Sequence, residues 1–458
     1  MKTSINSDFF YHMYPLGMCG APERNDFSSP AGNGLIRVCD QIPHLKTLGI
    51  SAVYLGPLFE STAHGYDTLD YYHVDRRLGT NEDLKKLIAR FHENGISVVL
   101  DGVFNHTGRD FFAFRDLQEK GESSIYRSWF LNVDFGKRSP AGDRFSYEGW
   151  SGHYDLVKLN TSNKAVREHL FGAVKCWIED FGIDGIRLDA ADVLEGSFMD
   201  SLAAFCVSLK PDFWLLGEVV HGDYRTWTNE NRLDSVTNYE VYKGLWSSLN
   251  DANFFEIAWS LNRQSGPEGI YRHLSLYNFV DNHDVNRVAS LLKKQSHLFP
   301  LYGMLFTIPG IPSLYYGSEW GFRGEKKNGS DAEMRPALSF IPDTCKPAVD
   351  SVALEKAIQT FARIRREHPA LQKGTYRQVH VSSEQFVFLR REGDEQILVA
   401  VNAADANATL TAPIGEWTGS DSSWKDALEG QSVFKGSGGK LTIMIPASWL
   451  RILVRIRN

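Results

Sequence analysis

Gly185-Ile-Arg-Leu-Asp-Ala-Ala-Asp192 is the stretch of sequence that decides the fold. Apolar and charged residues alternate along it, and glycines bound the apolar run. This pattern predicts a short strand that delivers its side chains to the edge of a sheet. Because Arg187 and Asp189 are two residues apart, their side chains lie on one face of that strand. A buried arginine keeps a neighbouring carboxylate ionised, which suits either a nucleophile or a structural salt bridge.

The composition is that of an ordinary globular protein. The 458 residues carry a formal net charge of −7, and 43% are hydrophobic and 23% charged. This balance lacks the basic footprint of nucleic-acid binding. Five scattered cysteines without CxxC spacing argue against a disulfide framework or a zinc site. No apolar segment at the start resembles a signal peptide, and the longest apolar passage, 301–316, is too short to cross a bilayer. We therefore expect a cytoplasmic protein without membrane contact.

Short apolar runs alternate with helical patterns along most of the chain. Strands are predicted at 9–16, 52–58, 97–104, 185–189, 213–219, 235–239, 274–280 and 312–316, and helices at 36–48, 84–93, 165–181 and 198–209. Eight such alternations predict an α/β fold with a parallel sheet closed as a (β/α)8 TIM barrel. An open doubly wound sheet is the alternative, although no glycine-rich dinucleotide-binding motif follows the first strand.

Two regions fall outside this alternation. About sixty residues rich in Gly, Ser, Asp and aromatics follow the third strand, which is longer than a barrel loop needs. After a helix at 352–368, period-two alternation at 386–390, 396–401, 440–446 and 450–456 predicts antiparallel strands. We therefore expect a catalytic barrel formed by 1–106 and 161–372, a small inserted domain at 107–160, and a C-terminal antiparallel β-sandwich at 373–458.

Charged clusters close four of the predicted strands. They are Asp101-Gly-Val-Phe-Asn105-His106 after the third, Arg187-Leu-Asp189 after the fourth, Gly217-Glu218 after the fifth and Asp281-Asn-His283-Asp284 after the seventh. Polar residues at any one strand end have a structural explanation. In a parallel barrel, however, all strands point their carboxyl ends at the same rim, so these four clusters should converge.

In this order and content, the clusters resemble the four signature regions of the α-amylase superfamily, glycoside hydrolase family 13. His64-Gly-Tyr66-Asp67 and Tyr315-Tyr-Gly317-Ser-Glu319 resemble the family's segments after the second strand and at the eighth. The resemblance covers essentially the whole chain. It implies a glycosidase of carbohydrate metabolism that acts on α-glucans.

The chemistry explains why such residues are needed. Retaining hydrolysis of a glycosidic bond uses two carboxyl groups about 5–5.5 Å apart, one as nucleophile and one as general acid/base. The resemblance implies that Asp189 is the nucleophile, Glu218 the general acid/base, and Asp284 the third carboxylate, which orients the sugar hydroxyls. Arg187 would keep Asp189 ionised. A bell-shaped pH–rate profile is expected.

The resemblance also implies a set of substrate-binding residues: Tyr66, Asp101, His106, Arg187, His283, Asp331 and Arg335. His106 and His283 would donate to hydroxyls of the sugar at the cleavage point, and Tyr66 would stack on it. Asp101 would brace Arg187 from the neighbouring strand. Asp331 and Arg335 would grip the next sugar toward the non-reducing end, although a surface ion pair also explains them.

Details within the motifs narrow the expected activity. Lys158 stands where cyclomaltodextrinases, neopullulanases and maltogenic amylases carry a lysine, and Ala190 follows the nucleophile in place of the valine associated with α-1,6 preference. Both features favour cleavage of α-1,4 bonds in maltooligosaccharides, cyclodextrins or starch-like glucans. That group commonly carries an extra N-terminal β-domain, whereas here we expect the barrel to begin within about ten residues. A monomer and a homodimer both remain open.

No cofactor is required by this chemistry, and no metal site is predicted. Asn105 is the one candidate calcium ligand, because its family counterpart often has that role. Transglycosylation can accompany hydrolysis, since both use the same carboxylates. The alternative function is that of a non-catalytic relative, an α-glucan-binding or assembly subunit of the same fold. All three carboxylates stand in their motifs, which favours an enzyme.

Overall fold

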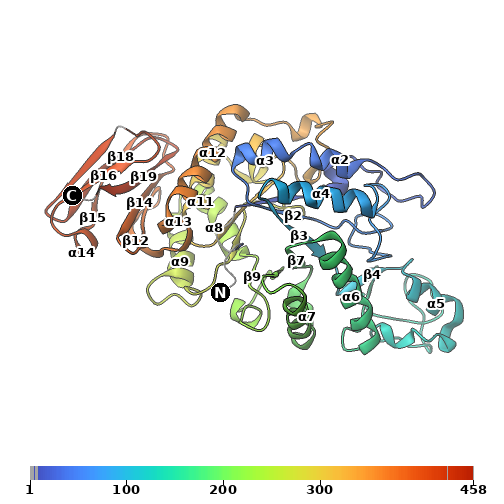
Figure 1. Cartoon of the computed structure of the whole chain (residues 1–458). Helices are drawn as coiled ribbons and strands as arrows, with labels where there is room; N and C mark the ends of the chain where they lie inside the picture. The colour runs from blue at the N-terminus through green and yellow to red at the C-terminus, as the bar shows by residue number, and fades with distance from the viewer. Residues whose placement is uncertain (1–4, 6–8, 328, 431, 457–458) are drawn as a thin grey trace.

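Eight parallel strands form the centre of the molecule. The computed structural model describes residues 5, 9–327, 329–430 and 432–456 (Figure 1). The strands are β1 (Phe10–Met13), β2 (Ala52–Leu55), β3 (Ser97–Gly102), β7 (Gly185–Leu188), β8 (Trp214–Gly217), β9 (Ser235–Val236), β10 (Tyr277–Asn278) and β11 (Ile311–Tyr315). Their order is β10-β11-β1-β2-β3-β7-β8-β9. A parallel bridge between Thr237 and Tyr277 joins β9 to β10 and closes the sheet. The predicted (β/α)8 barrel is confirmed.

Helices cover the outside of this barrel. They include α4 (Asn81–Glu93), α6 (Lys164–Cys176), α7 (Gly196–Leu209), α8 (Tyr239–Asn250), α9 (Phe254–Ser265), α11 (Leu298–Thr307) and α12 (Ser351–Glu367). Helix α4 shows how the sequence specifies such an element. It begins at a capping box in which Thr80 and Asp83 each accept a backbone N–H of the other. Its apolar residues recur every three or four positions and face the barrel. Among the residues that the structure describes, no helix is both long and apolar enough to cross a membrane.

Two predicted helices differ from those observed. The helix expected at 36–48 is two helices, α2 (Gly34–Cys39) and α3 (Ile42–Leu48). Pro43 lies in the first turn of α3, where the missing N–H is harmless, so the chain restarts there instead of continuing α2. The helix expected at 165–181 ends as α6 at Cys176 and continues as a π-helical turn, Trp177–Phe181.

The long segment after β3 forms a small antiparallel sheet of its own. It contains β4 (His106–Gly108), α5 (Phe112–Lys120), β5 (Gly149–Trp150) and β6 (His153–Lys158), with strand order β4-β6-β5. Since β4 begins four residues after β3 ends and His106 pairs with Lys158, this sheet adjoins the barrel rim. Left-handed backbone at Ser151 (φ 49°) and Gly152 (φ 84°) makes the two-residue turn between β5 and β6.

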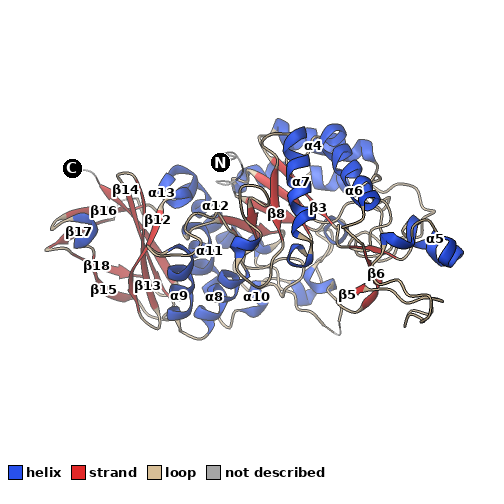
Figure 2. Ribbon diagram, turned by 90° about the horizontal axis from the view of Figure 1, so that it is seen from below, coloured by secondary structure: helices blue, strands red, loops and turns tan. Residues whose placement is uncertain are grey.

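The C-terminal region is one antiparallel sheet. Its strands are β12 (Thr375–Val381), β13 (Gln385–Glu392), β14 (Glu395–Asn402), β15 (Ala408–Pro413), β16 (Ser422–Asp426), β17 (Val433–Ser437), β18 (Lys440–Ile445) and β19 (Trp449–Ile456), in the order β12-β13-β14-β19-β16-β17-β18-β15. The sheet folds over so that residues from both of its ends, including Val387 and Ile443, share one core. Figures 1 and 2 place this sheet and α5 at opposite ends of the molecule.

Strand β13 is buried on both faces. Phe386 and Phe388 join the main core of the barrel, while Val387 and Leu389 join the core inside the folded sheet. This explains why the alternation along β13 is between two sets of apolar residues. The C-terminal sheet is therefore packed against the barrel along a continuous apolar surface.

Two buried arginines lie near this boundary, and one of them, Arg390, crosses it. Arg365 of α12 donates to the carbonyl oxygens of Phe306 (3.1 Å) and Leu371 (2.7 Å). Arg390 of β13 donates to the carbonyl of Thr307 (2.6 Å). Phe306 and Thr307 are the last residues of α11, whose C-terminal carbonyls have no partner within the helix. Burial lowers the pKa of both guanidinium groups to about 9, so both remain charged at neutral pH.

Candidate active site

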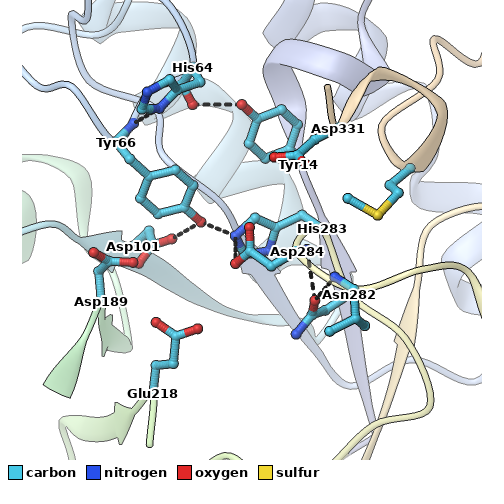
Figure 3. A network of polar contacts seen from close by, with 12 residues as sticks. Tyr14, His64, Tyr66, Asp101, Asp189, Glu218, Asn282, His283, Asp284 and Asp331 are labelled. Carbon is cyan, nitrogen blue, oxygen red and sulfur yellow. Dashed lines mark hydrogen bonds and ion pairs between the residues drawn. The ribbon is translucent and has the colours of Figure 1, made fainter. Parts of the chain in front are cut away.

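Three carboxyl groups meet at the rim where the barrel strands end. Asp189 directly follows β7, Glu218 directly follows β8, and Asp284 lies in the loop after β10 (Figure 3). Parallel pairing sets their height: β3 pairs with β7 and β7 with β8 in register, so their carboxyl ends are level. This register brings the strand-end clusters together, as the sequence predicted.

Arg187 links two of these carboxyl groups. Its Nη1 lies 2.9 Å from Oδ1 of Asp189, and its Nη2 lies 2.9 Å from Oε2 of Glu218. Nη1 also donates to Oδ1 of Asp101 at 2.8 Å, which is the bracing expected from the sequence. The arginine side chain is 3% exposed. One planar cation therefore holds both carboxyls, one on each arm.

The environment of Asp189 combines opposing influences on its ionisation. Burial raises the pKa of Asp189 well above its usual range, and Arg187 works in the other direction. The neighbouring Glu218 and Asp101 carboxylates raise it further. The expectation that Arg187 keeps Asp189 ionised thus describes only one of these influences. Asp189 loses its proton at a higher pH than an exposed aspartate does.

The two oxygens of Glu218 have different partners. Oε2 accepts from Nη2 of Arg187 and from the backbone N–H of Ala190 at 3.1 Å. Ala190 adopts a left-handed conformation (φ 46°) that is uncommon for a residue with a side chain. Oε1 faces the hydroxyl of Tyr239 at 3.4 Å. Because Oε2 already accepts from two donors, a proton on this carboxyl belongs on Oε1.

Asp284 is held by two cationic or polar partners. Its Oδ2 lies 2.8 Å from Nε2 of His283, and its Oδ1 lies 3.0 Å from Nη2 of Arg335. Although burial acts to raise it, these two partners hold the pKa of Asp284 well below its usual range. The side chain of Asn282 accepts the backbone N–H groups of Asp284 and Val285, which fixes the turn that presents this carboxylate.

Tyr66 and His283 form a stacked pair beside these groups. Their ring centroids are 5.3 Å apart with an interplanar angle of 10°. The Tyr66 hydroxyl donates to Oδ2 of Asp101 at 2.9 Å and contacts Nε2 of His283 (Figure 3). The structure therefore brings both residues to the site. In the structure, Nε2 of His283 faces two acceptors of the protein itself, Tyr66 and Asp284. From the sequence, we expected it to donate to a sugar hydroxyl.

His106 lies on the other side of Asp189. Its Nε2 is 3.9 Å from Oδ2 of Asp189 and finds no hydrogen-bond partner among the described residues. Burial lowers the pKa of His106 to about 3, so the ring is neutral at physiological pH. The indole of Trp150, from the inserted segment, lies 5.4 Å from the ring.

Asp331 and Arg335 belong to the same site. Nη2 of Arg335 lies 3.0 Å from Asp331 as well as from Asp284, and its guanidinium lies 4.6 Å above the ring of Tyr14. The Arg335 side chain is 12% exposed, while its partners Asp331 and Asp284 are 24% and 40% exposed. The Tyr14 hydroxyl donates to the carbonyl of His64, so the group also reaches the segment that carries Tyr66.

Sequence reasoning missed several residues at the site. They are His12, Tyr14, Tyr54, Trp150, Tyr239 and Asn282. His12, Tyr14 and Tyr54 lie in or directly after strands that end without a charged cluster, and the rule that every strand end faces the rim would have found them. The sequence contains no comparable signal for Trp150, because its position depends on the β5–β6 turn.

Asn105, the candidate calcium ligand, is buried beside His106. Its Nδ2 donates to Nδ1 of His106 at 3.1 Å. Within the described ranges, no three His, Cys, Asp or Glu side chains are grouped so that they could hold an ion. Calcium takes six to eight oxygen ligands, which include backbone and Asn carbonyl oxygens as well as carboxylates.

Comparison with known proteins gives consistent matches. The family described as "Alpha amylase, catalytic domain" matches residues 22–360. A cyclomaltodextrinase from a Bacillus species is 33% identical over 444 residues, which cover 91% of this chain and 76% of that protein. Neopullulanase 2 of Thermoactinomyces vulgaris is 32% identical over 424 residues, covering 90% and 69%. The structure of a cyclic α-maltosyl-(1→6)-maltose hydrolase from Arthrobacter globiformis superposes with a TM-score of 0.79 at 25% identity, covering 98% of each chain.

Proposed function

The chain belongs to the α-amylase family of glycoside hydrolases, and from that premise we propose that it cleaves α-1,4-glucosidic bonds with retention of anomeric configuration. It is an α-glucan glycoside hydrolase. The proposed substrates are maltooligosaccharides, cyclodextrins and starch-like glucans. The observation that carries the retaining mechanism is the placement of Asp189 and Glu218 on the two arms of Arg187.

The reaction follows from this geometry. Asp189 attacks the anomeric carbon and forms a covalent glycosyl-enzyme, while Glu218 gives its proton to the leaving oxygen. Oε1 carries that proton, because Oε2 is occupied by Arg187 and the Ala190 N–H. Glu218 then takes a proton from the water that releases the sugar. Another sugar hydroxyl in place of this water gives transglycosylation.

The remaining groups bind the sugar at the cleavage point. Asp284 stays ionised, so it can accept sugar hydroxyls and favour the positively charged transition state. We propose that these hydroxyls take over the hydrogen bonds now made between Asp284 and His283. The buried Nε2 of His106 gains a partner in the same way, which is favourable because buried polar atoms without partners are costly. Tyr66 gives the ring on which the sugar stacks.

Two observations bear on the substrate. The cyclomaltodextrinase and neopullulanase relatives support maltooligosaccharides and cyclodextrins, and Lys158 supports α-1,4 cleavage. The hydrolase from Arthrobacter globiformis matches this chain over 98% of both lengths, which adds cyclic α-maltosyl-(1→6)-maltose to the substrates worth testing. We further propose a cytoplasmic enzyme that needs no cofactor.

The test is a product time course with maltoheptaose, β-cyclodextrin, pullulan, soluble starch and cyclic α-maltosyl-(1→6)-maltose. NMR spectroscopy of the first products should show the α-anomer, and the Asp189→Asn protein should be inactive. A first product with β-configuration would contradict the retaining mechanism. Undiminished turnover by Asp189→Asn would contradict the role of Asp189. Rapid cyclodextrin opening with poor use of starch would favour a cyclomaltodextrinase-like specificity, and preferred attack on starch an ordinary α-amylase.

A further inference from the structure

A small cavity, lined by both apolar and polar residues, lies inside the barrel against the catalytic groups. Arg187 and Glu218 line it on one side, and His12, Thr237 and His283 line other parts of its wall. Its volume is about 20 Å³. A cavity needs roughly 10–15 Å³ to hold a water molecule, and such a site must offer two to four polar partners. The cavity therefore has room for one water, and the polar groups in its wall can bind it.

Two buried histidine nitrogens need a partner there. His12 is 3% exposed and His283 is 1% exposed. Neither Nε2 of His12 nor Nδ1 of His283 has a hydrogen-bond partner among the described residues. The two rings meet edge to face with centroids 5.1 Å apart, and both belong to the cavity wall. Buried polar atoms are rarely left without a partner, so this pair points to a bound molecule.

The opposite side of the His283 ring determines where its hydrogen lies. The Asp284 carboxylate, 2.8 Å from Nε2, can only accept. The Tyr66 hydroxyl donates its hydrogen to Asp101, so its oxygen also accepts from Nε2. Nε2 of His283 must therefore carry a hydrogen. Nδ1, on the other edge of the ring, is left to find its partner in the cavity.

We propose that one water molecule occupies this cavity and bridges Nε2 of His12 to Nδ1 of His283. The bridge holds the His283 ring with its Nε2 hydrogen directed at Asp284 and the sugar. His12 is thus a positioning residue that acts through His283. Its catalytic consequence rests on the proposed function, in which Asp284 stabilises the transition state.

Two substitutions of His12 test this arrangement. In the wild-type protein, the ring centroids of His12 and Tyr54 are 4.2 Å apart. His12→Phe keeps a ring that can stack on Tyr54 but removes the nitrogen. His12→Gln restores a hydrogen-bonding group near the position of Nε2. We expect His12→Phe to lower kcat on maltoheptaose roughly tenfold and change KM less than about twofold, because transition-state interactions are lost selectively. His12→Gln should stay within about threefold of wild type.

His297→Phe is the matched control. His297 is also a buried histidine, and its Nε2 donates to the carbonyl of Ala403 at the boundary with the C-terminal sheet. Its loss should lower Tm and leave kcat unchanged. The proposal is overturned if His12→Phe keeps the wild-type kcat. It is also overturned if His12→Gln loses as much activity as His12→Phe, because packing alone would then explain the effect.

A crystal structure of the wild-type protein at near-atomic resolution tests the water directly. Density for one water within hydrogen-bond distance of both nitrogens is the expected result, and an empty cavity overturns the proposal. Because it uses the wild-type protein, this measurement tests the proposal even if a His12 variant does not fold. It also separates the two proposals, because a protein inactive on every glucan tested refutes the proposed function while the water remains visible.

Discussion

At the scale of single residues, the guanidinium of Arg187 is the group on which the site depends. It contacts Asp189, Glu218 and Asp101 at 2.8–2.9 Å. A lysine has the same charge but presents it at one point, so it cannot hold two carboxyls on separate arms. The choice of arginine is therefore a geometric requirement as well as an electrostatic one.

Arg187→Lys should lower kcat by at least about 100-fold, because both reacting carboxyls lose their fixed orientation. Kinetics on maltoheptaose measure this loss. Arg451→Lys is the control, since Arg451 lies in the C-terminal sheet, is also buried and pairs with Asp426 at 2.8 Å. That variant should keep the wild-type kcat. A kcat for Arg187→Lys within tenfold of wild type would contradict the arrangement proposed for the carboxyls.

Asp189→Asn should make the protein more stable at neutral pH. The folded state raises the pKa of Asp189 above its value of 3.8 in the unfolded chain, because burial disfavours the charge. The folded state then binds more protons than the unfolded state above pH 3.8, so this residue's contribution falls as pH rises through the raised pKa. An asparagine at this position does not titrate, so its contribution to stability does not change with pH.

Melting temperatures of Asp189→Asn and wild type, measured from pH 3 to 8, test this prediction. The variant should melt higher at pH 7, and the difference should shrink as pH approaches 3. A variant that melts lower than wild type at pH 7 would show that pairing with Arg187 outweighs the cost of burying the charge.

At the scale of elements, the sequence predicted the strands better than the helices. The apolar run that ends in Arg187-Leu-Asp189 predicted strand β7. Because parallel strands end at one rim of a barrel, it also predicted which charged clusters lie near that end. The prediction of one helix over 36–48 was wrong, because a second helix begins at Pro43 although the apolar pattern is unbroken. Local periodicity cannot distinguish a proline that starts a helix from one that kinks it.

The site, too, contains residues that the local sequence locates and residues that it does not. Asp189, Glu218 and Asp284 could be located because their strands or loops carry recognisable clusters. Trp150 could not, because it reaches His106 only through the turn at Ser151 and Gly152 and the pairing of β6 with β4. The opposing influences on the pKa of Asp189 also needed coordinates, since they depend on burial and on three neighbouring carboxylates.

Thr80→Ala tests whether α4 is specified by its N-terminal cap. The substitution removes half of the capping box with Asp83, so the free energy of unfolding should fall by about 1 kcal/mol. Chemical denaturation measures this change. Because α4 is on the outside of the barrel, kcat should be unchanged. An equal loss from Thr47→Ala, whose exposed hydroxyl donates within α3, would argue against a specific effect of the cap.

Lys158→Asp tests how the inserted segment influences specificity. Lys158 ends β6, pairs across the sheet with His106 and lies 2.8 Å from Glu148. An aspartate there places a negative charge beside Glu148 and next to His106, for which we propose sugar binding. In the family that this chain resembles, oligo-1,6-glucosidases tend to carry an aspartate at this position. The ratio of α-1,6 to α-1,4 cleavage should therefore rise, as measured with isomaltotriose and maltotriose. An unchanged ratio would remove Lys158 as a specificity determinant.

At the scale of the whole molecule, we expect the barrel and the C-terminal sheet to unfold as one cooperative unit, because they share an apolar core. The three parts that we propose, 1–106 with 161–372, 107–160 and 373–458, divide the sequence, but β13 and β14 contribute one face each to the barrel core. Arg365 of α12 and Arg390 of β13 donate to the last carbonyls of α11, so the end of this barrel helix is bonded both from the barrel and from the C-terminal sheet.

Arg390→Met should lower the free energy of unfolding by about 2–4 kcal/mol, because the carbonyls of Thr307 and Gly374 lose their buried donor. Thermal unfolding should remain a single transition, since both parts share the apolar surface. Two separate transitions in the variant or in wild type would show that the C-terminal sheet is an independent domain. The Arg451→Lys protein, altered inside the sheet and away from the boundary, is the control.

The burial of both faces of β13 has a consequence for recombining this enzyme with its relatives. The crossover point suggested by the sequence, near residue 373, would join a barrel from one parent to a sheet from another. Phe386 and Phe388 would then meet a foreign α11, and the hydrogen bonds of Arg390 would depend on backbone shaped by different neighbours. Chimeras should fold only when α11, α12, β13 and β14 are inherited together, so the unit of exchange is this four-element block and not the domain.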